Sequence, residues 1–380
     1  MKKTLTHTLV ALALLSSVGV LTTAPVQAEE EEVVEYADDR VLVQIEAGVD
    51  PQVVAAEYGI EKVQPLGDGA ENWNIFYVNP GEVDDWMDKL RDAKYIKLIE
   101  RDIRIFPQLF FDPAYKDQWH QKYIGADQLW KSNRNYRTIA FIDSGVDYSH
   151  PDLSGKIVQG YDFVNYDPIA NDEYGTGTHI AGIAAATHNN LTGGKGVDPT
   201  AKIMPLKVMN ENGVSYTSTI ADAIYWATHH GADVISITAG TTVRYTSVLQ
   251  SAINYAWQRG DFIVSQAGNN SSTTPRYPAS YSHVFSVNAI DPEDNLWYRS
   301  NRGPWVDISA PGTYIYSTKL GGGMYHYTGT ERAVGVTAGA ASLVWKSGMT
   351  NVGVENYLID KALPIPYTGT YWYHGRLNLI

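Results

Sequence analysis

The sequence predicts a chain of the α/β class whose main part is a mostly parallel sheet with helices on both faces, preceded by a small α+β domain. From Asn135 onward, runs rich in β-branched residues alternate with helical segments, which is typical of a parallel sheet covered by helices. Acidic side chains concentrate before that region, which indicates a separate unit. The chain has 380 residues and is 44% hydrophobic, so it can bury a large core and is not mostly disordered.

The N-terminus has the features of a secretory signal peptide. Lys2 and Lys3 precede an apolar run from Leu9 to Leu21, and Val26-Gln27-Ala28 is typical of a cleavage site. We therefore expect residues 1–28 to be removed and the mature protein to be secreted and extracellular. No later stretch approaches the roughly 18–20 apolar residues of a spanning helix, so no membrane partner is expected after cleavage. The chain has no Cys, which excludes disulfides and cysteine nucleophiles.

Residues 29–110 are predicted to form an acidic first domain. They hold 20 acidic and 8 basic side chains, within a chain whose net charge is −13. The rest of the chain is therefore close to neutral, and this step places a boundary near Phe106–Phe110, before a second domain at 111–380. No block of basic residues is present to hold a phosphate backbone, so nucleic acid is not an expected partner.

The first domain has the element order of a small split βαβ unit. Alternating apolar residues between Arg40 and Ile45 predict its first strand. The predicted elements are strand Arg40–Glu46, helix Pro51–Tyr58, strand Lys62–Gln64, strand Trp73–Val78, helix Gly81–Leu90 and strand Ile96–Ile105.

The second domain is predicted to contain buried strands that alternate with helices. The strands are Thr138–Asp143, Ala201–Val208, Ala232–Thr238 and Phe262–Ala267. The helices are Thr178–Ala186, Thr219–His230, Thr246–Arg259 and Glu331–Ser347. In such sheets the reactive groups lie at the carboxyl ends of the strands and on the loops beyond them.

Three polar residues stand at such positions. Asp143 ends an apolar strand, His179 follows a glycine-rich turn, and Asn269 comes just after another strand. Each has an ordinary structural explanation when taken alone: Asp143 could bind loop amides, His179 could be a core residue, and Asn269 could serve a turn.

Taken together, the three residues and their surroundings resemble the subtilisin-like serine proteases, also called subtilases or peptidase family S8. The matching strings keep that family's order from about Asp112 to Ile380. They are Ile142-Asp143-Ser144-Gly145, His150-Pro151-Asp152-Leu153, Gly177-Thr178-His179, Ala267-Gly268-Asn269, Tyr277-Pro278-Ala279, Ser309-Ala310-Pro311-Gly312 and Gly375-Arg376-Leu377-Asn378. The resemblance implies the subtilisin-like fold, with Asp143 orienting the imidazole, His179 as base and Asn269 as oxyanion donor.

The nucleophile is where this sequence departs from the family. The stretch Gly329-Thr330-Glu331-Arg332-Ala333 places Glu331 where the resemblance requires the catalytic serine, and Arg332 where a Met is usual. We therefore expect a pseudopeptidase that binds peptide segments with little or no hydrolysis. We also expect the Glu331 carboxylate to fill the oxyanion site and to pair with a protonated His179, because helix N-termini favour carboxylates.

Other functions remain open from the sequence. The protein could be an active endopeptidase with an unusual nucleophile, such as a water held by Glu331. It could also be a protease inhibitor or folding assistant that acts through its N-terminal domain. The resemblance implies that residues 29–110 correspond to an inhibitory propeptide, so the expected partners are peptide or protein segments, including the chain's own N-terminal domain. Without a serine, we expect the junction near Phe106–Asp112 to stay uncut unless another protease acts there.

Calcium is the cofactor that the resemblance implies, in a structural role. The resemblance maps the family's strong calcium site onto Asp112, Asp152 and the loop around Asn190, which offer hard oxygen ligands. The expected ligands are the side chains of Asp112, Asp152 and Asn190 and the carbonyls of His188, Thr192 and Gly194. An ordinary turn rich in Asn and Asp is the alternative.

Overall fold

The computed structural model describes residues 36–67, 70–103, 112–131, 136–243 and 247–380. By its internal contacts the chain divides into two compact units, Met1–Gln108 and Leu109–Ile380. The expected signal peptide at residues 1–28 and most of the expected junction lie outside the described residues. None of the helices in the described part of the chain is long and apolar enough to cross a membrane.

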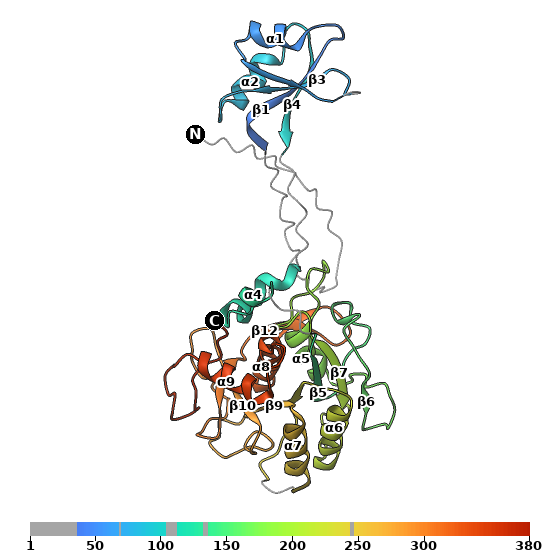
Figure 1. Ribbon diagram of the computed structural model, residues 1–380, viewed down its shortest axis with the longest axis vertical. Helices are drawn as coiled ribbons and strands as arrows, with labels where there is room; N and C mark the ends of the chain where they lie inside the picture. The colour runs from blue at the N-terminus through green and yellow to red at the C-terminus, as the bar shows by residue number, and fades with distance from the viewer. Residues whose placement is uncertain (1–35, 68–69, 104–111, 132–135, 244–246) are drawn as a thin grey trace, which may run out of the picture. The chain divides into compact units, whose positions relative to one another are not determined.

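The first unit is a four-stranded sheet with two helices (Figure 1). Its strand order is β2-β3-β1-β4, and the described strand pairs are antiparallel. Its elements are β1 Tyr36–Ile45, α1 Pro51–Glu57, β2 Lys62–Pro65, β3 Trp73–Tyr77, α2 Val83–Leu90 and β4 Ile96–Ile103. The inward residues Val41 and Val43 of β1 pack with Phe76 and Leu90 in its core. The predicted order of six elements is confirmed.

The second unit contains a seven-stranded sheet in the order β11-β10-β9-β8-β5-β7-β6, and its strand pairs are parallel. The strands are β5 Thr138–Asp143, β6 Tyr161–Asp162, β7 Lys202–Lys207, β8 Val234–Ile237, β9 Phe262–Gln266, β10 Phe285–Ile290 and β11 Ile308–Pro311. The main helices are α5 Thr176–Ala185, α6 Thr217–His229, α7 Ser247–Arg259, α8 Thr330–Val344 and α9 Asn351–Lys361. The predicted α/β class is confirmed.

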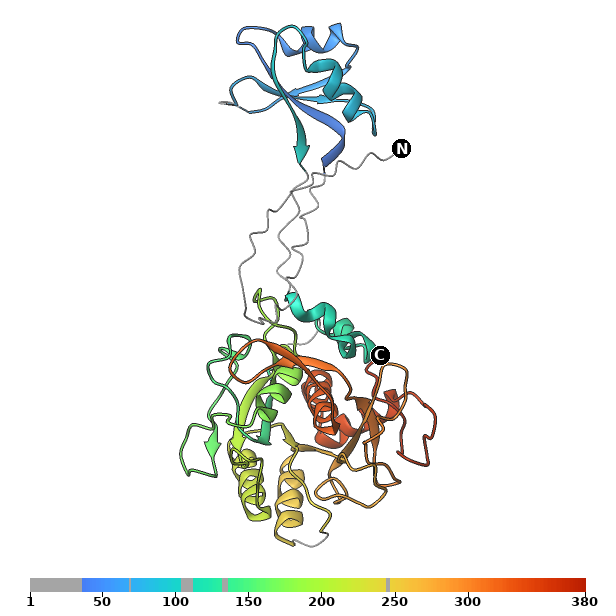
Figure 2. The same cartoon turned by 180° about the vertical axis from the view of Figure 1, so that it is seen from behind.

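The two faces of this sheet carry different helices (Figures 1 and 2). Ile139 and Phe141 of β5 belong to the core that contains α5 and α8, whereas Ala140 and Ile142 belong to the core that contains α6 and α7. This alternation follows from the two-residue period of a strand, which directs neighbouring side chains to opposite faces. Burial on both faces explains why β5 is apolar throughout.

Several smaller elements complete the second unit. An antiparallel hairpin of β12 Ile315–Thr318 and β13 Met324–Tyr327 packs against α5. Short helical segments precede β5 or follow it: η1 Pro113–Asp117, α3 Trp119–Tyr123, α4 Ala126–Leu129 and η2 Pro151–Leu153. The hairpin is important for the site, because β13 lies beside the histidine described next.

Candidate active site

Asp143 ends β5 and is buried at the carboxyl edge of the sheet, with 1% of its surface exposed. Its carboxylate accepts a hydrogen bond of 2.7 Å from the Ser144 N–H and another from the Thr238 hydroxyl. Burial raises the pKa of Asp143 to about 7, although these hydrogen bonds oppose the rise. Its described partners therefore come from its own loop and from the residue that follows β8.

His179 lies in the first turns of α5 and has no exposed surface. Its Nε2 contacts the carbonyl oxygen of Tyr325 at 3.1 Å, and the ring of Tyr327 meets it edge-on with centroids 4.8 Å apart. A carbonyl can only accept, so Nε2 carries the proton, while Nδ1 has no hydrogen-bond partner among the described residues. Burial first, and then the charge of Arg332, lowers the pKa of His179 well below its ordinary value.

This geometry corrects one expectation from the sequence. Glu331 does not pair with a protonated His179, because the Nε2 hydrogen bond goes to Tyr325 and the imidazole is held neutral. The partners of Asp143 are Ser144 and Thr238, so its carboxylate does not hold the imidazole either. The Asp143 carboxylate and the His179 imidazole therefore have separate partners.

Glu331 stands in the first turn of α8, where the free N–H groups of a helix favour a carboxylate. Its Oε1 accepts a hydrogen bond of 2.7 Å from Nδ2 of Asn269. The amide oxygen of Asn269 in turn accepts from the Thr330 N–H at 3.0 Å and contacts the Thr330 hydroxyl at 2.7 Å. Both ends of the Asn269 amide are therefore engaged by the start of α8.

Arg332 is a residue of this site that sequence reasoning did not assign a role. It is 8% exposed, and its guanidinium carbon lies 5.1 Å from the centre of the Tyr327 ring. Within the described part of the chain, its Nε and Nη1 have no hydrogen-bond partner. After burial, its charge is the next cause of the lowered pKa of His179, and it weakly opposes the rise in the pKa of Asp143 that burial causes. An Arg inside a helix that is otherwise small and apolar, from Ala333 to Val344, was the available signal.

A cavity of about 620 Å³ opens beside Glu331 and Arg332. Other parts of its lining come from the turn after β8, from Thr238 to Thr241, and from Arg276 with the residues after it. Other lining residues are Tyr174, Thr176, Met209, Gly213, Val214, Ser215, Thr217, Ile220, Leu249, Gln266, Asn269, Tyr277, Pro278 and Thr328. The cavity can hold a side chain or a short peptide segment.

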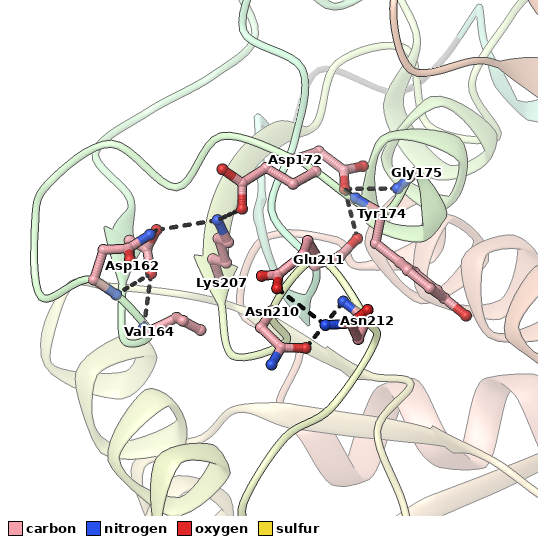
Figure 3. Close-up of polar contacts among 12 residues, drawn as sticks. Asp162, Val164, Asp172, Tyr174, Gly175, Lys207, Asn210, Glu211 and Asn212 are labelled. Carbon is pink, nitrogen blue, oxygen red and sulfur yellow. Dashed lines mark hydrogen bonds and ion pairs between the residues drawn. The ribbon is translucent and has the colours of Figure 1, made fainter.

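Asp172 is a second residue that the sequence did not single out, and it connects the Asp143 loop to the His179 helix. Figure 3 shows its carboxylate accepting hydrogen bonds from the N–H groups of Tyr174 and Gly175, at 2.9 and 2.8 Å. It also accepts from the Ser144 hydroxyl at 2.8 Å and from the Thr178 N–H at 2.9 Å. Because Ser144 follows Asp143 and Thr178 precedes His179, this buried carboxylate fixes both turns.

Lys207, a buried residue at the end of β7, forms neighbouring ionic contacts (Figure 3). Its ammonium lies 2.7 Å from a Glu173 oxygen and 3.3 Å from an Asp162 oxygen. Burial alone would lower the pKa of Lys207, but the Glu173 hydrogen bond and the Asp162 charge outweigh it, so the pKa is raised. The contact between Lys207 and Glu173 connects the loop before α5 to the end of β7.

The residues expected to hold calcium lie close together, away from this cavity. The Asp152 carboxylate accepts hydrogen bonds from Asn190 Nδ2 and the Gly194 N–H, at 3.0 and 2.9 Å. The Asp112 carboxylate accepts from the N–H groups of Asn189 and Asn190, at 2.7 and 3.0 Å. Burial, and to a smaller degree Asp112, raises the pKa of Asp152 to about 6.

Two buried carboxylates beside an Asn amide are a donor set of hard oxygens, which suits calcium. Thr192 belongs to the same loop, where its N–H donates to Asn190 Oδ1 at 3.2 Å, whereas the His188 ring contacts the Gly196 carbonyl at 2.9 Å. No cluster of three or more His, Asp and Glu side chains arranged for a metal occurs in the part of the chain that the structure describes. Any cation here would therefore depend on amide and carbonyl oxygens as well as the two carboxylates.

Comparison with known proteins places these features in a family. The model of the subtilase family matches residues 135–373. The thermophilic serine proteinase of Bacillus sp. (strain AK1) is 37% identical over 358 residues, which cover 90% of this chain and 86% of that protein. Thermitase of Thermoactinomyces vulgaris is 40% identical over 269 residues, which cover 70% of this chain and 96% of thermitase.

A solved structure agrees with these sequence relationships. It belongs to the proteases from Pseudoalteromonas arctica PAMC 21717, with a TM-score of 0.67 and 27% identity, and the match covers 70% of this chain and 96% of that chain. The family model covers more than half of the sequence and includes Asp143, His179, Asn269 and Glu331. The chain therefore belongs to the subtilase family.

Proposed function

We propose that this chain is a subtilase homologue that binds peptide segments with little or no hydrolysis, because Glu331 occupies the position of the nucleophilic serine. The hydrogen bond from the Asn269 amide to the Glu331 carboxylate carries the proposal. In the family mechanism that amide stabilises the oxyanion. In this chain the Asn269 amide donates instead to the Glu331 carboxylate, a charged group of the protein itself.

The chemistry of a carboxylate supports this reading. Attack by a carboxylate on a peptide carbonyl would give an anhydride in place of an ester, and the leaving amine would still need a proton. In subtilisin, the studied example of this family, loss of the serine lowers kcat by roughly 10⁶-fold. Asp143 is not available to share a proton with Glu331, since its carboxylate is engaged by Ser144 and Thr238.

The state of His179 is a second, independent support. A general base must present a lone pair to the group it deprotonates. The nitrogen that contacts Tyr325 carries the proton, and the other nitrogen is buried without a partner. Loss of the nucleophile is thus accompanied by a base that faces the β13 backbone.

Three further proposals concern the rest of the chain. We propose that residues 1–28 direct secretion, and that residues 29–110 remain attached as a propeptide-like domain because the chain cannot cut its own junction. We also propose that Asp112, Asp152 and Asn190, with carbonyls of His188, Thr192 and Gly194, hold a structural calcium ion. Calcium would there neutralise the two buried carboxylates.

The test is peptide hydrolysis by protein produced in a host without extracellular proteases, with intact mass recorded on the same samples. We expect the wild type to match the His179→Ala variant at the background rate and to retain residues 29–110. Glu331→Ser should exceed both. Wild-type turnover that disappears in His179→Ala would overturn the proposal, because it would demonstrate a working nucleophile.

A further inference from the structure

Two arginines that line the cavity beside Glu331 have N–H donors without an acceptor among the described residues. Nε and Nη1 of Arg332 and Nε of Arg276 are buried, and no residue that the structure describes accepts a hydrogen bond from them. Arg332 is more than nine-tenths buried, and Arg276 is partly buried and donates from Nη2 to the Gly240 carbonyl at 2.8 Å. Both side chains line the same cavity, Arg332 from α8 and Arg276 from the segment after β9.

Such donors are costly in a folded protein. A buried polar group without a partner costs about 1–3 kcal/mol, and charged groups cost more. Glu331 does not remove this cost, because its carboxylate is held by Asn269 and acts on Arg276 only through its charge. The ring of Tyr327 faces Arg332 but accepts none of its N–H groups in a hydrogen bond. The unsatisfied donors point to a ligand that accepts from them.

The charges on the cavity wall define the ligand further. Among the described lining residues the formal charges are those of Arg276, Arg332 and Glu331, which leave one positive charge in excess. A monoanion balances that excess, whereas a phosphate carries about −1.5 to −2 and would face Glu331. A carboxylate also matches the planar fork of a guanidinium, which binds it through two parallel hydrogen bonds.

We propose that this cavity binds a peptide through a carboxylate, supplied by an acidic side chain or by a free C-terminus, with Arg332 and Arg276 as its two ligands. This inference rests on the proposed function and names the class of segment that the site accepts. A peptide with a neutral amide at that position would leave the guanidinium groups unpaired. The cavity is therefore expected to bind such a neutral peptide more weakly than one with a carboxylate.

The experiment measures binding by isothermal titration calorimetry with four acetylated tetrapeptides. Ala-Ala-Ala-Glu-amide and Ala-Ala-Ala-Gln-amide differ only in the side-chain charge, and tetra-alanine as the free acid or the amide tests the C-terminus. We expect at least one acid to bind about tenfold or more tightly than its neutral partner, which corresponds to about 1.4 kcal/mol. The pair that shows the difference identifies the source of the carboxylate.

Variants assign the preference to the two arginines. Arg332→Met and Arg276→Gln should each reduce it severalfold, and Arg332→Lys should retain part of it because the charge stays while the fork is lost. Arg259→Gln, an exposed position at the end of α7, is the matched control and should change nothing. The wild-type comparison of Glu with Gln does not depend on whether any variant folds.

The outcomes separate this inference from the proposed function. Equal binding of all four peptides overturns the carboxylate preference and leaves peptide binding intact. No binding of any peptide overturns both. Cleaved peptide in the mass spectra of the same samples overturns the proposed lack of hydrolysis, whereas a preference for the acids in those samples still supports the carboxylate site.

Discussion

The side-chain amide of Asn269 donates a hydrogen bond of 2.7 Å to the carboxylate of Glu331. Thr330 holds the other end of the same amide, through its N–H and its hydroxyl, so Asn269 cannot turn without breaking these contacts. A substrate carbonyl could reach this amide only by displacing a charged group at a helix N-terminus, where carboxylates are stabilised. Under the proposed function, this hydrogen bond would keep the Asn269 amide from stabilising an oxyanion.

The substitution Glu331→Ser alone should give little peptidase activity. Glu331→Ser restores a hydroxyl, but the Arg332 charge still lowers the pKa of His179. We expect the double variant Glu331→Ser, Arg332→Met to exceed Glu331→Ser by about tenfold or more in kcat, a barrier difference of about 1.4 kcal/mol. Steady-state hydrolysis of one peptide by both variants provides the measurement, and His179→Ala in the double background is the control. Equal rates would show that Arg332 does not limit the base.

Asp143 should make the protein less stable as the pH rises. Its folded pKa is about 7, against an ordinary 3.8, so between these values the folded chain holds a proton that the unfolded chain has lost. The contribution to the free energy of unfolding is present below about pH 4 and disappears by about pH 7, and a shift of about 3 units corresponds to at most about 4 kcal/mol.

The variant Asp143→Asn removes this titration. We expect its stability relative to wild type to increase steadily from acid to neutral pH, as measured by urea unfolding at several pH values. The contribution of His179 to the pH dependence of stability has the opposite sign, because its lowered pKa reduces stability as the pH falls. Wild type and Asp143→Asn share this contribution, so it cancels in the comparison. Asp222→Asn, on the exposed side of α6, is the control. Parallel pH profiles for wild type and Asp143→Asn would contradict the prediction.

The sequence predicted most of the fold because the main strands are apolar and bounded. β5 matches its expected range, Thr138–Asp143, to the residue. β10 was missed although every residue in it is buried, because Ser286 and Asn288 interrupt its apolar pattern. The Ser286 hydroxyl contacts Asp307 and the Trp305 carbonyl, and these partners are about 20 positions away and invisible to a local pattern.

Motif order named the candidate site residues but could not give their contacts. His179 lies in α5 and Glu331 in the first turn of α8. The contact of His179 with Tyr325 depends on a hairpin almost 150 residues later, whose exposed strand β13 has little apolar pattern. Arg332 would be expected in solvent by its charge, and only the tertiary packing of α8 shows that it is buried.

Asp172 should be among the most sensitive positions for stability. Asp172→Ala leaves the buried N–H of Thr178 and the partly buried N–H of Gly175 without their acceptor, so we expect a loss of about 3 kcal/mol or more in the free energy of unfolding. Asp172→Asn keeps one acceptor oxygen and should lose less. Asp167→Ala removes a single exposed hydrogen bond to the Ile169 N–H and should cost less than about 1 kcal/mol. Urea unfolding measures all three, and similar losses at positions 172 and 167 would count against the network.

Calcium should raise the melting temperature through Asp112 and Asp152. Both carboxylates are buried in one cluster, and the charge of Asp112 contributes to the raised pKa of Asp152. A cation bound there relieves this repulsion, and calcium at a hundredfold excess over its Kd adds about 2.7 kcal/mol to the stability of the folded state. We therefore expect a melting temperature several degrees higher in calcium than in chelator for wild type and for the exposed control Asp222→Asn.

The increase should be absent in Asp152→Asn, which loses one charge of the pair while keeping an amide of the same shape. A wild-type melting temperature that is the same in calcium and in chelator would rule out the site, and an undiminished increase in Asp152→Asn would place the ion elsewhere.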